Sequence, residues 1–351
     1  MYGCKKINRK IGVLLAQLGT PEAPTAKALR PYLKKFLGDP RVIEKPRWLW
    51  WLILNFIILN VRPKRSAKLY SRIWTKNGSP LEVITKSQTQ KLKERFLDND
   101  QIEITYGMRY SKPSIETALD ELINKGCSSI VLLNMYPQYS GTTVAANYDA
   151  VFKHLLTKRV VPTLKVIDPY YDNSGYINAL AEIANKDLEL NHPEKLVLSY
   201  HGIPESYIDS GDTYCCQCMV TTKMLLPKLK IAPENVIHTY QSRFGKDPWL
   251  EPYTDLTIEK LAKEGVKHIS VFCPGFTADC LETLDELGNE GKHLFNEHGG
   301  EKFNLISCLN DHQSWIDAMA SMVYSEINPL LTNCRLDCEF LCPNKQAQIK
   351  K

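Results

Sequence analysis

Short apolar runs alternate with longer amphipathic stretches along most of the chain. Runs of Val, Ile and Leu carry few polar positions, which is typical of buried strands in parallel sheets. This pattern predicts eight strands, at Lys10–Leu18, Ile102–Met108, Ser129–Tyr136, Thr163–Asp168, Lys195–Tyr200, Asn235–Tyr240, His268–Pro274 and Lys302–Cys308.

The stretches between these strands have helical periodicity. It predicts helices at Lys86–Asp98, Ile115–Lys125, Ser174–Leu188, Val220–Lys228, Leu256–Glu264, Asp279–His298 and His312–Ile327. Because strand and helix alternate through both halves, we expect an α/β protein with doubly wound parallel sheets. The break at 153–162 predicts a domain boundary, which gives one domain at 1–157, a second at 158–330 and a Cys-bearing tail at 331–351.

Two apolar segments have lengths that exclude a membrane span. The apolar stretch within Lys5–Leu18 is only eight residues long. It fits a first strand better than a signal peptide. Trp48–Leu59 has twelve residues with Asn55 among them, whereas a spanning helix needs about 20. This second segment is therefore either a buried helix or an interfacial one.

Composition narrows the class of protein. The chain has 351 residues, 44% hydrophobic and 24% charged, with a net charge of +5, and these are ordinary globular values. The mildly basic balance, without a recognition motif, gives no reason to expect a nucleic-acid partner. The eleven cysteines are not spaced like the disulfide framework of a small secreted protein.

One histidine stands where ligands bind in open α/β sheets. His201 lies in Ser199–Pro204, directly after a predicted strand, and such sheets bind ligands at the carboxyl ends of their strands. An imidazole there can accept a proton or hold a metal ion. A structural histidine in a strand-to-loop turn is the alternative.

Four carboxylates follow a later strand. At about 100° per residue, Asp279, Glu282, Glu286 and Glu290 share one helix face, and we call this set the acidic file. A solvated outer face is one interpretation. An inward-facing row that passes protons or holds a cation is the other, because close carboxylates raise one another's pKa values.

Three further strand ends carry polar or aromatic groups. Gly107–Tyr110 presents Arg109 and Tyr110, Met135–Thr143 presents hydroxyls, and Gln241–Gly245 presents Arg243. These groups suit an acidic, aromatic-contacting ligand, although each arginine could instead form a structural ion pair.

Taken together, these motifs resemble the ferrochelatase family, which inserts ferrous iron into a porphyrin. The resemblance runs from about Gly12 to Met322 and is closest to the proteobacterial branch. The matching segments are Leu18–Glu22, Gly78–Leu81, Gly107–Tyr110, Tyr136–Ser140, Ser199–Pro204, Gly211–Tyr214, Gln241–Gly245, Pro274–Phe276, Leu281–Leu284 with Asp279, and Leu309-Asn310.

The resemblance implies two Rossmann-like domains with an active-site cleft between them, the chelatase fold. It implies that His201 and Glu282 are the catalytic pair and contact the metal, and that Glu286, Glu290 and Asp279 deliver metal or remove protons. The residues implied to bind the porphyrin are Leu18, Arg109, Tyr110, Tyr139, Ser140 and Arg243.

Substrates and location also follow from the resemblance. The implied substrates are Fe²⁺ and protoporphyrin IX, with coproporphyrin as an alternative. A cobalt or nickel chelatase of the same fold and a non-catalytic porphyrin- or haem-binding protein are further alternatives. The family's membrane-touching lip falls at about residues 47–65, where Arg47 and Arg65 flank the apolar segment, and basic flanks favour anionic headgroups. We therefore expect a cytoplasmic protein attached peripherally to the inner membrane.

The tail cysteines resemble those of family members with a [2Fe–2S] cluster. Cys334, Cys338 and Cys342 have x3 spacing. The animal enzymes place a fourth cysteine directly after the Tyr-Pro-Gln-Tyr-Ser motif, where this chain has Gly141. One of Cys215, Cys216 or Cys218 is then the candidate fourth ligand. Reduced thiols or a zinc site are the alternatives.

Overall fold

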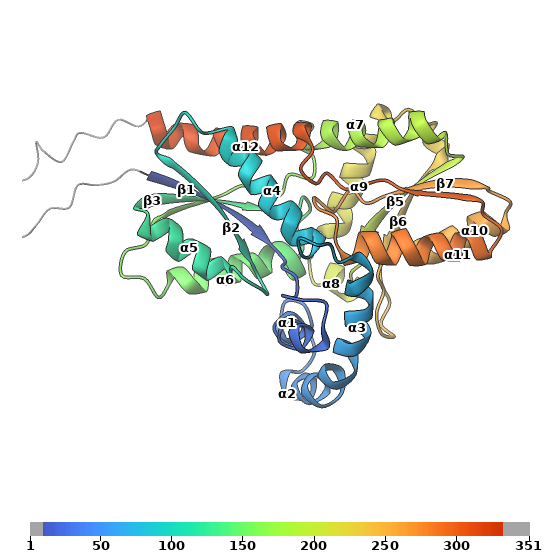
Figure 1. Cartoon of the computed structure of the whole chain (residues 1–351), viewed down its shortest axis with the longest axis horizontal. Coiled ribbons are helices and arrows are strands. Elements are labelled where there is room, and N and C mark those ends of the chain that lie inside the picture. Colours follow the sequence, from blue (N-terminus) through green and yellow to red (C-terminus); the bar gives the residue numbers. More distant parts are fainter. Residues whose placement is uncertain (1–9, 333–351) are drawn as a thin grey trace, which may run out of the picture.

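The computed structural model describes residues 10–332 and contains two four-stranded parallel sheets within that range (Figure 1). The eight strands predicted from the apolar runs are confirmed, with ends shifted by up to three residues. The first sheet has the order β2-β1-β3-β4, from β1 (Lys10–Gln17), β2 (Ile102–Met108), β3 (Cys127–Asn134) and β4 (Thr163–Val166). The second has the order β6-β5-β7-β8, from β5 (Lys195–His201), β6 (Val236–Gln241), β7 (His268–Phe272) and β8 (Lys302–Leu305).

The two sheets repeat one topology. In each, the first strand in sequence lies between the second and the third, and the fourth is at the edge. Strands that are apolar on both faces must be covered on both faces by helices. The central strands show this, because Val13, Leu14, Leu15 and Val197 are completely buried.

The predicted helices are all present with altered bounds. They are α4 (Pro80–Glu94), α5 (Ile115–Asn124), α7 (Ser174–Asn191), α9 (Tyr214–Leu225), α10 (Thr254–Lys263), a π-helical segment η5 (Glu282–Gly291) continued by α11 (Lys292–Glu297), and α12 (Gln313–Thr332). The pattern missed α1 (Ala26–Gly38), α3 (Leu59–Ile73), the π-helical turn η2 (Gly141–Ala145), α6 (Ala146–Leu155) and α8 (Glu205–Asp209). Pro31 and Pro63 lie inside α1 and α3, and a proline is ordinarily a sign that a helix ends.

The domain boundary predicted after residue 157 is wrong. β4 begins at Thr163 and pairs with β3, so the first sheet continues past that boundary. The two halves also share one apolar core, in which side chains of β1 and β3 meet those of β5 through α7 and α12. Figure 1 shows α7 and α12 lying end to end along one side of both sheets. The halves are therefore packed as one continuous body.

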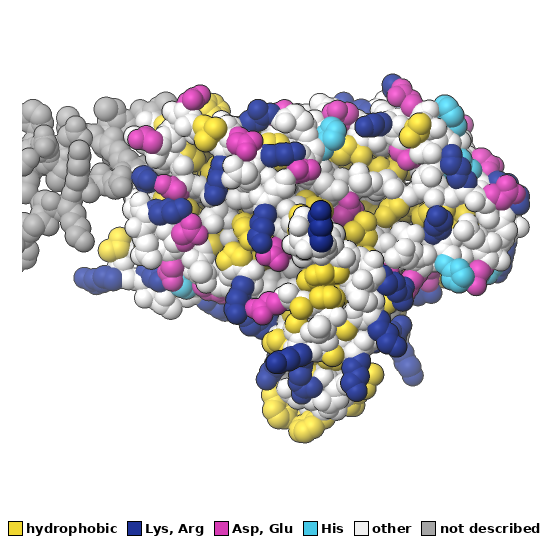
Figure 2. All heavy atoms as spheres, viewed as in Figure 1, with side chains coloured by type: hydrophobic (Ala, Val, Ile, Leu, Met, Phe, Trp, Pro, Cys, Tyr) yellow, Lys and Arg dark blue, Asp and Glu magenta, His cyan; other side chains and the backbone are white. Residues whose placement is uncertain are grey.

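The lip projects from the body as helices α1, α2 (Arg47–Leu52) and α3 with the π-helical turn η1 (Ile53–Ile58) between the last two (Figure 1). Its inner side has its own apolar cluster, which includes Leu33, Trp50 and Leu54. The outer side exposes Trp48 by 71%, Trp51 by 57%, Phe56 by 65% and Ile57 by 59%. The alternative of a buried core helix does not hold for this segment, because four of its large apolar side chains are exposed and the tip of the lip is apolar in Figure 2.

Candidate active site

His201 is the last residue of β5 and presents its imidazole at the carboxyl end of the second sheet. Its Nδ1 lies 2.7 Å from the carbonyl oxygen of Gly202. A carbonyl oxygen only accepts hydrogen bonds, so Nδ1 carries the proton when the ring is neutral. The Nε2 nitrogen then keeps its lone pair, which can accept a proton or hold a metal ion.

The peptide of Gly202 is fixed by the neighbouring strand. Its N–H donates to the carbonyl oxygen of Gln241 at 2.8 Å, and β5 and β6 pair His201 with Gln241. A Cβ at Gly202 would stand 2.9 Å from that same oxygen and 3.3 Å from the ring of Trp249. Glycine is therefore required where the backbone turns away from the His201 imidazole.

Glu282 begins the π-helical segment η5 and is half-buried. The thiol of Cys280 lies beside its carboxylate. Burial raises the pKa of this thiol, and the charge of the carboxylate raises that pKa further. Burial raises the pKa values of Tyr32 and Tyr70, and the charge of Glu282 adds to this rise. The same charge opposes the lowering of the pKa of Arg62 by burial. Since Tyr32, Tyr70 and Arg62 belong to α1 and α3, the lip forms one wall around Glu282.

Tyr136 lies on the first-sheet side of the same region. Burial raises its pKa well above the usual value, and the charge of Glu282 and the phenols of Tyr110 and Tyr32 contribute. Its hydroxyl is buried and has no hydrogen-bond partner among residues 10–332. The carboxyl ends of both sheets thus meet around Glu282, with one unused phenol among the surrounding groups.

Three carboxylates of the acidic file interact with one another. Burial and the charges of Glu282 and Glu290 together raise the pKa of Glu286 to about 7, against the opposing hydrogen bond from Ser242. Glu290 is 58% exposed and lies 3.7 Å from Arg72 of α3. The row therefore leads from the half-buried Glu282 through Glu286 to the surface, which favours the inward-facing interpretation over a solvated outer face.

Asp279 does not join this row. Its carboxylate accepts hydrogen bonds from Asn310 at 2.6 Å, Thr283 at 3.0 Å and the N–H of Cys308 at 3.3 Å. The prediction that it shares a face with the other three assumed a helix from Asp279, whereas the helical segment begins only after Cys280, so Asp279 lies in the preceding loop. Asp279 instead anchors the start of this segment to the loop after β8.

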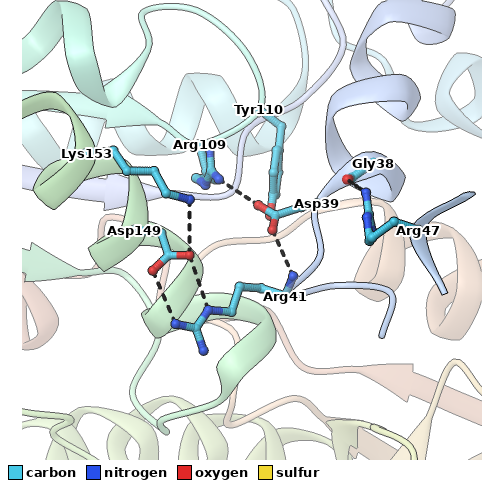
Figure 3. A network of polar contacts seen from close by, with 8 residues as sticks. All are labelled: Gly38, Asp39, Arg41, Arg47, Arg109, Tyr110, Asp149 and Lys153. Carbon is cyan, nitrogen blue, oxygen red and sulfur yellow. Dashed lines mark hydrogen bonds and ion pairs between the residues drawn. The ribbon is translucent and has the colours of Figure 1, made fainter. Parts of the chain in front are cut away.

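Arg109 and Tyr110 contact a carboxylate of the chain itself. Asp39 is 6% exposed and accepts from Arg109 Nη2 at 2.6 Å and from the Tyr110 hydroxyl at 2.9 Å (Figure 3). The backbone N–H of Arg41 donates to it at 2.9 Å, and the Arg41 side chain pairs with Asp149 at 3.2 Å. This network attaches the base of the lip to the first sheet, and porphyrin binding by Arg109 and Tyr110 stays a prediction.

The other four residues expected to bind the porphyrin are dispersed. Leu18 packs on the apolar cluster of the lip. Ser140 is buried and its hydroxyl donates to Asp212 at 2.9 Å, while the N–H of Tyr139 donates to Gln217 at 2.6 Å. Arg243 lies over the ring of Tyr253 and donates to Asp255 at 2.9 Å. Their contact with a porphyrin stays a prediction.

The cysteines expected to hold a cluster fall in two places. Cys334, Cys338 and Cys342 lie outside the described residues. On α9, Cys218 is completely buried with a pKa well above its usual value, mainly because of burial, whereas Cys216 is exposed. No group of three His, Cys, Asp or Glu side chains within residues 10–332 is arranged to hold a metal ion.

Sequence reasoning missed several residues around Glu282. Tyr136 and Gln241 stand inside motifs that were recognised, but nothing in their spacing indicates where the side chains point. Tyr32, Tyr70 and Arg62 belong to helices whose prolines hide their periodicity. The Ser242 hydroxyl donates a hydrogen bond to Glu286, which lies 44 residues further along the chain. No local sequence pattern predicts this hydrogen bond.

Solved structures share this architecture. SirB from Bacillus subtilis with Fe³⁺ superposes with a TM-score of 0.55 at 12% identity, over 90% of this chain and 97% of that one. The sirohydrochlorin chelatase SirB from Bacillus subtilis subspecies spizizenii in complex with cobalt gives 0.52 at 11% identity, over 92% and 98%. This chain, with two parallel sheets that have the same strand order as each other, is therefore a protein of the chelatase fold.

Comparison of sequences gives the family within that fold. The family model "Ferrochelatase" matches residues 10–327. Proteins named ferrochelatase from Herminiimonas arsenicoxydans, Teredinibacter turnerae and Rhodopseudomonas palustris are 48%, 45% and 46% identical, covering 89%, 91% and 91% of this chain and 86%, 88% and 93% of theirs. The chain belongs to the ferrochelatase family, whose members are metal chelatases of the lyase class that act in haem synthesis.

Proposed function

We propose that this protein inserts Fe²⁺ into protoporphyrin IX to form protohaem, the last step of haem synthesis. One observation carries the proposal: the imidazole of His201 ends β5, and the backbone of Glu282 is bonded to Gln241 at the end of the neighbouring strand β6, with further carboxylates behind Glu282. The reaction needs both a base and a path for cations, because two pyrrole protons must leave as one divalent metal enters.

The chain's own groups have distinct parts in this reaction. His201 Nε2 accepts a pyrrole proton or contacts the metal, and its orientation is held by the bond from Nδ1 to Gly202. Glu282 accepts a proton or contacts the metal, in the same region as the phenols of Tyr32 and Tyr136. Glu286, with a pKa near 7, can gain and lose a proton at physiological pH, which suits it to pass protons toward Glu290 or metal in the opposite direction.

An anaerobic assay with Fe²⁺ and protoporphyrin IX tests the proposal. We expect His201→Ala to abolish turnover and Glu282→Gln to reduce it at least 100-fold, with melting temperatures close to wild type, because neither side chain is fully buried. Near wild-type turnover in either variant would overturn the assigned roles. Coproporphyrin in the same assay tests the alternative substrate, and we expect a lower kcat/KM for it.

A non-catalytic porphyrin-binding protein is the competing function. Retention of His201, Glu282 and the carboxylates behind them supports catalysis, since simple binding of a porphyrin needs no row of proton acceptors. Insertion of Zn²⁺ into protoporphyrin, followed by fluorescence, separates the two functions. Tight porphyrin binding without metal insertion would support the competitor.

We also propose that the lip attaches the protein peripherally to the cytoplasmic face of the inner membrane. Trp48, Trp51 and Ile57 are exposed, and Figure 2 shows lysines and arginines on the sides of the lip, next to its apolar tip. Apolar groups ringed by cations suit anionic headgroups over an acyl boundary. Among residues 10–332, no helix is both long and apolar enough to cross a bilayer.

The [2Fe–2S] cluster stays a prediction of the tail sequence. The cluster would take Cys334, Cys338 and Cys342 as three ligands. Among the candidate fourth ligands, Cys216 is exposed, and a thiolate ligand must be accessible to the cluster and deprotonated. The completely buried Cys218 does not fit this role.

A further inference from the structure

Gln241 contacts both of the segments that carry the proposed catalytic pair. It ends β6 opposite His201, and its backbone oxygen accepts from the N–H of Gly202 at 2.8 Å. Its side-chain Nε2 donates to the backbone oxygen of Glu282 at 2.9 Å. One residue therefore bonds the turn that orients the imidazole and the first residue of the π-helical segment.

The amide of Gln241 is itself held in place. The residue is 4% exposed, and its Oε1 accepts from the Ser199 hydroxyl at 2.8 Å. Ser199 shares a hydrogen bond with Thr254 at 2.8 Å, and Thr254 shares another with Thr239 at 2.8 Å. These three residues are completely or almost completely buried, so the side chain of Gln241 has little freedom to rotate.

We propose that Gln241 is a positioning residue for metal insertion, which sets the place of Glu282 relative to His201. The inference rests on the proposed roles of His201 and Glu282, but not on which porphyrin or metal is used. Gln241 itself touches neither substrate. It acts through the backbone of Glu282, because the π-helical segment begins there and its first carbonyl oxygen lies beside the strand ends.

The physical consequence of losing this bond is a shift of Glu282. Without the amide donor, a half-buried carbonyl oxygen loses a partner and the first turn of η5 loses its attachment to β6. A catalytic group misplaced by about 1 Å can cost about 100-fold in rate. We therefore expect the rate of metal insertion to fall, while porphyrin binding, which does not depend on this attachment, is retained.

The test uses two Gln241 variants and a matched control. Gln241→Met keeps the length of the side chain but removes the donor, and Gln241→Glu keeps its shape and its acceptor for Ser199. Gln88 provides the control, because its buried amide also donates to backbone oxygens, those of Thr277 at 2.9 Å and Asn310 at 2.7 Å, but not to Glu282. Gln88→Met thus removes two buried bonds from an amide to backbone oxygens, neither of which involves His201 or Glu282.

Steady-state rates, porphyrin binding by fluorescence and thermal melting are measured on the full chain for all variants. We expect kcat to fall 10- to 100-fold in both Gln241 variants, with the KM and the binding constant for protoporphyrin within threefold of wild type. Gln88→Met should keep kcat within threefold. If Gln241→Met does not fold, Gln241→Glu carries the test.

Wild-type kcat in a folded Gln241 variant would overturn the inference. Equal losses of kcat and melting temperature in the Gln241 and Gln88 variants would also overturn it, since they would indicate a purely structural role. The proposed function fails separately, when His201→Ala and Glu282→Gln retain activity. A loss seen with these two but not with the Gln241 variants would reject only the positioning role.

Discussion

The hydroxyl of Ser242 lies 2.8 Å from one carboxylate oxygen of Glu286 and 2.6 Å from the other. A hydroxyl has a single hydrogen, so it donates to one of these oxygens at a time. Ser242 adopts a φ of +69°, a left-handed conformation that is uncommon for serine. Even with this bond, burial keeps the pKa of Glu286 at about 7, so Glu286 exchanges its proton near neutral pH.

Glu286→Gln should change how stability depends on pH. The native pKa of about 7 lies above the ordinary value of 4.5, so the native state binds more protons than the unfolded state between these values. The contribution of Glu286 to wild-type stability therefore falls as pH rises from about 4.5 to 7, by about 3 kcal/mol at 1.4 kcal/mol per unit. We expect Glu286→Gln to be more stable than wild type at pH 8 but not at pH 4.5, as measured by chemical denaturation. Equal differences at both pH values would contradict the raised pKa.

The same residue should affect the metal. Below pH 7, the protonated Glu286 attracts cations less strongly, so we expect the apparent KM for Fe²⁺ to rise as pH falls in wild type. Glu286→Gln combined with Glu290→Gln should flatten this dependence and leave the KM for porphyrin unchanged, as measured by initial rates between pH 6 and 8. Unaltered metal kinetics in the double variant would mean that the row is only a solvated surface.

The exposed tip of the lip can be tested separately from the core. Trp51→Ser with Ile57→Ser should weaken binding to anionic liposomes at least tenfold, because each large apolar side chain contributes roughly 1.5–3 kcal/mol when buried. Liposome binding is measured by flotation or by light scattering, neither of which depends on tryptophan fluorescence. Leu156→Ser with Val160→Ser is the matched control, since these residues are 84% and 77% exposed away from the lip. Unfolding of the lip variant would show that its side chains support the core.

Asp39 should stabilise the base of the lip. Asp39→Asn removes the charge that Arg109 and Tyr110 contact, and hydrogen bonds to charged groups contribute about 1.5–3 kcal/mol. We expect the free energy of unfolding to fall by about 2 kcal/mol in urea denaturation. Glu22→Gln is the control, because Glu22 and its ion-pair partner Lys112 are both exposed. Such exposed pairs contribute about 0–1 kcal/mol to stability. Similar losses of unfolding free energy in both variants would show that the buried network stabilises the protein no more than an exposed ion pair does.

The colour of the purified protein tests whether the tail cysteines hold a cluster. If Cys334, Cys338 and Cys342 hold a [2Fe–2S] cluster, anaerobically purified protein should be red-brown and contain acid-labile sulfide. Replacement of the three by serine should bleach it, and Cys216→Ser should reduce the sulfide content. Colourless wild-type protein without sulfide would reject the cluster and leave the family assignment unaffected.

The strands, and the placing of His201 at the end of one of them, were predictable from local sequence. Continuous apolar runs such as the one in β3 predict buried parallel strands, because such runs are covered on both faces. The position of His201 directly after a strand likewise predicts a strand-end site. The apolar segment of the lip was recognisable as too short to span a membrane. Each of these inferences uses residues that are neighbours in the chain.

The remaining features were decided by contacts between distant segments. The pairing of β4 with β3 placed the end of the first sheet beyond the predicted boundary. The helical segment begins only after Cys280, so Asp279 lies in the loop before it, bonded to Asn310 and outside the row of carboxylates. Gln241 reaches Glu282 across 41 residues, and Arg109 reaches Asp39 across 70. A hydrogen bond depends on where two backbones meet in space, and the identity of either residue alone does not contain that information.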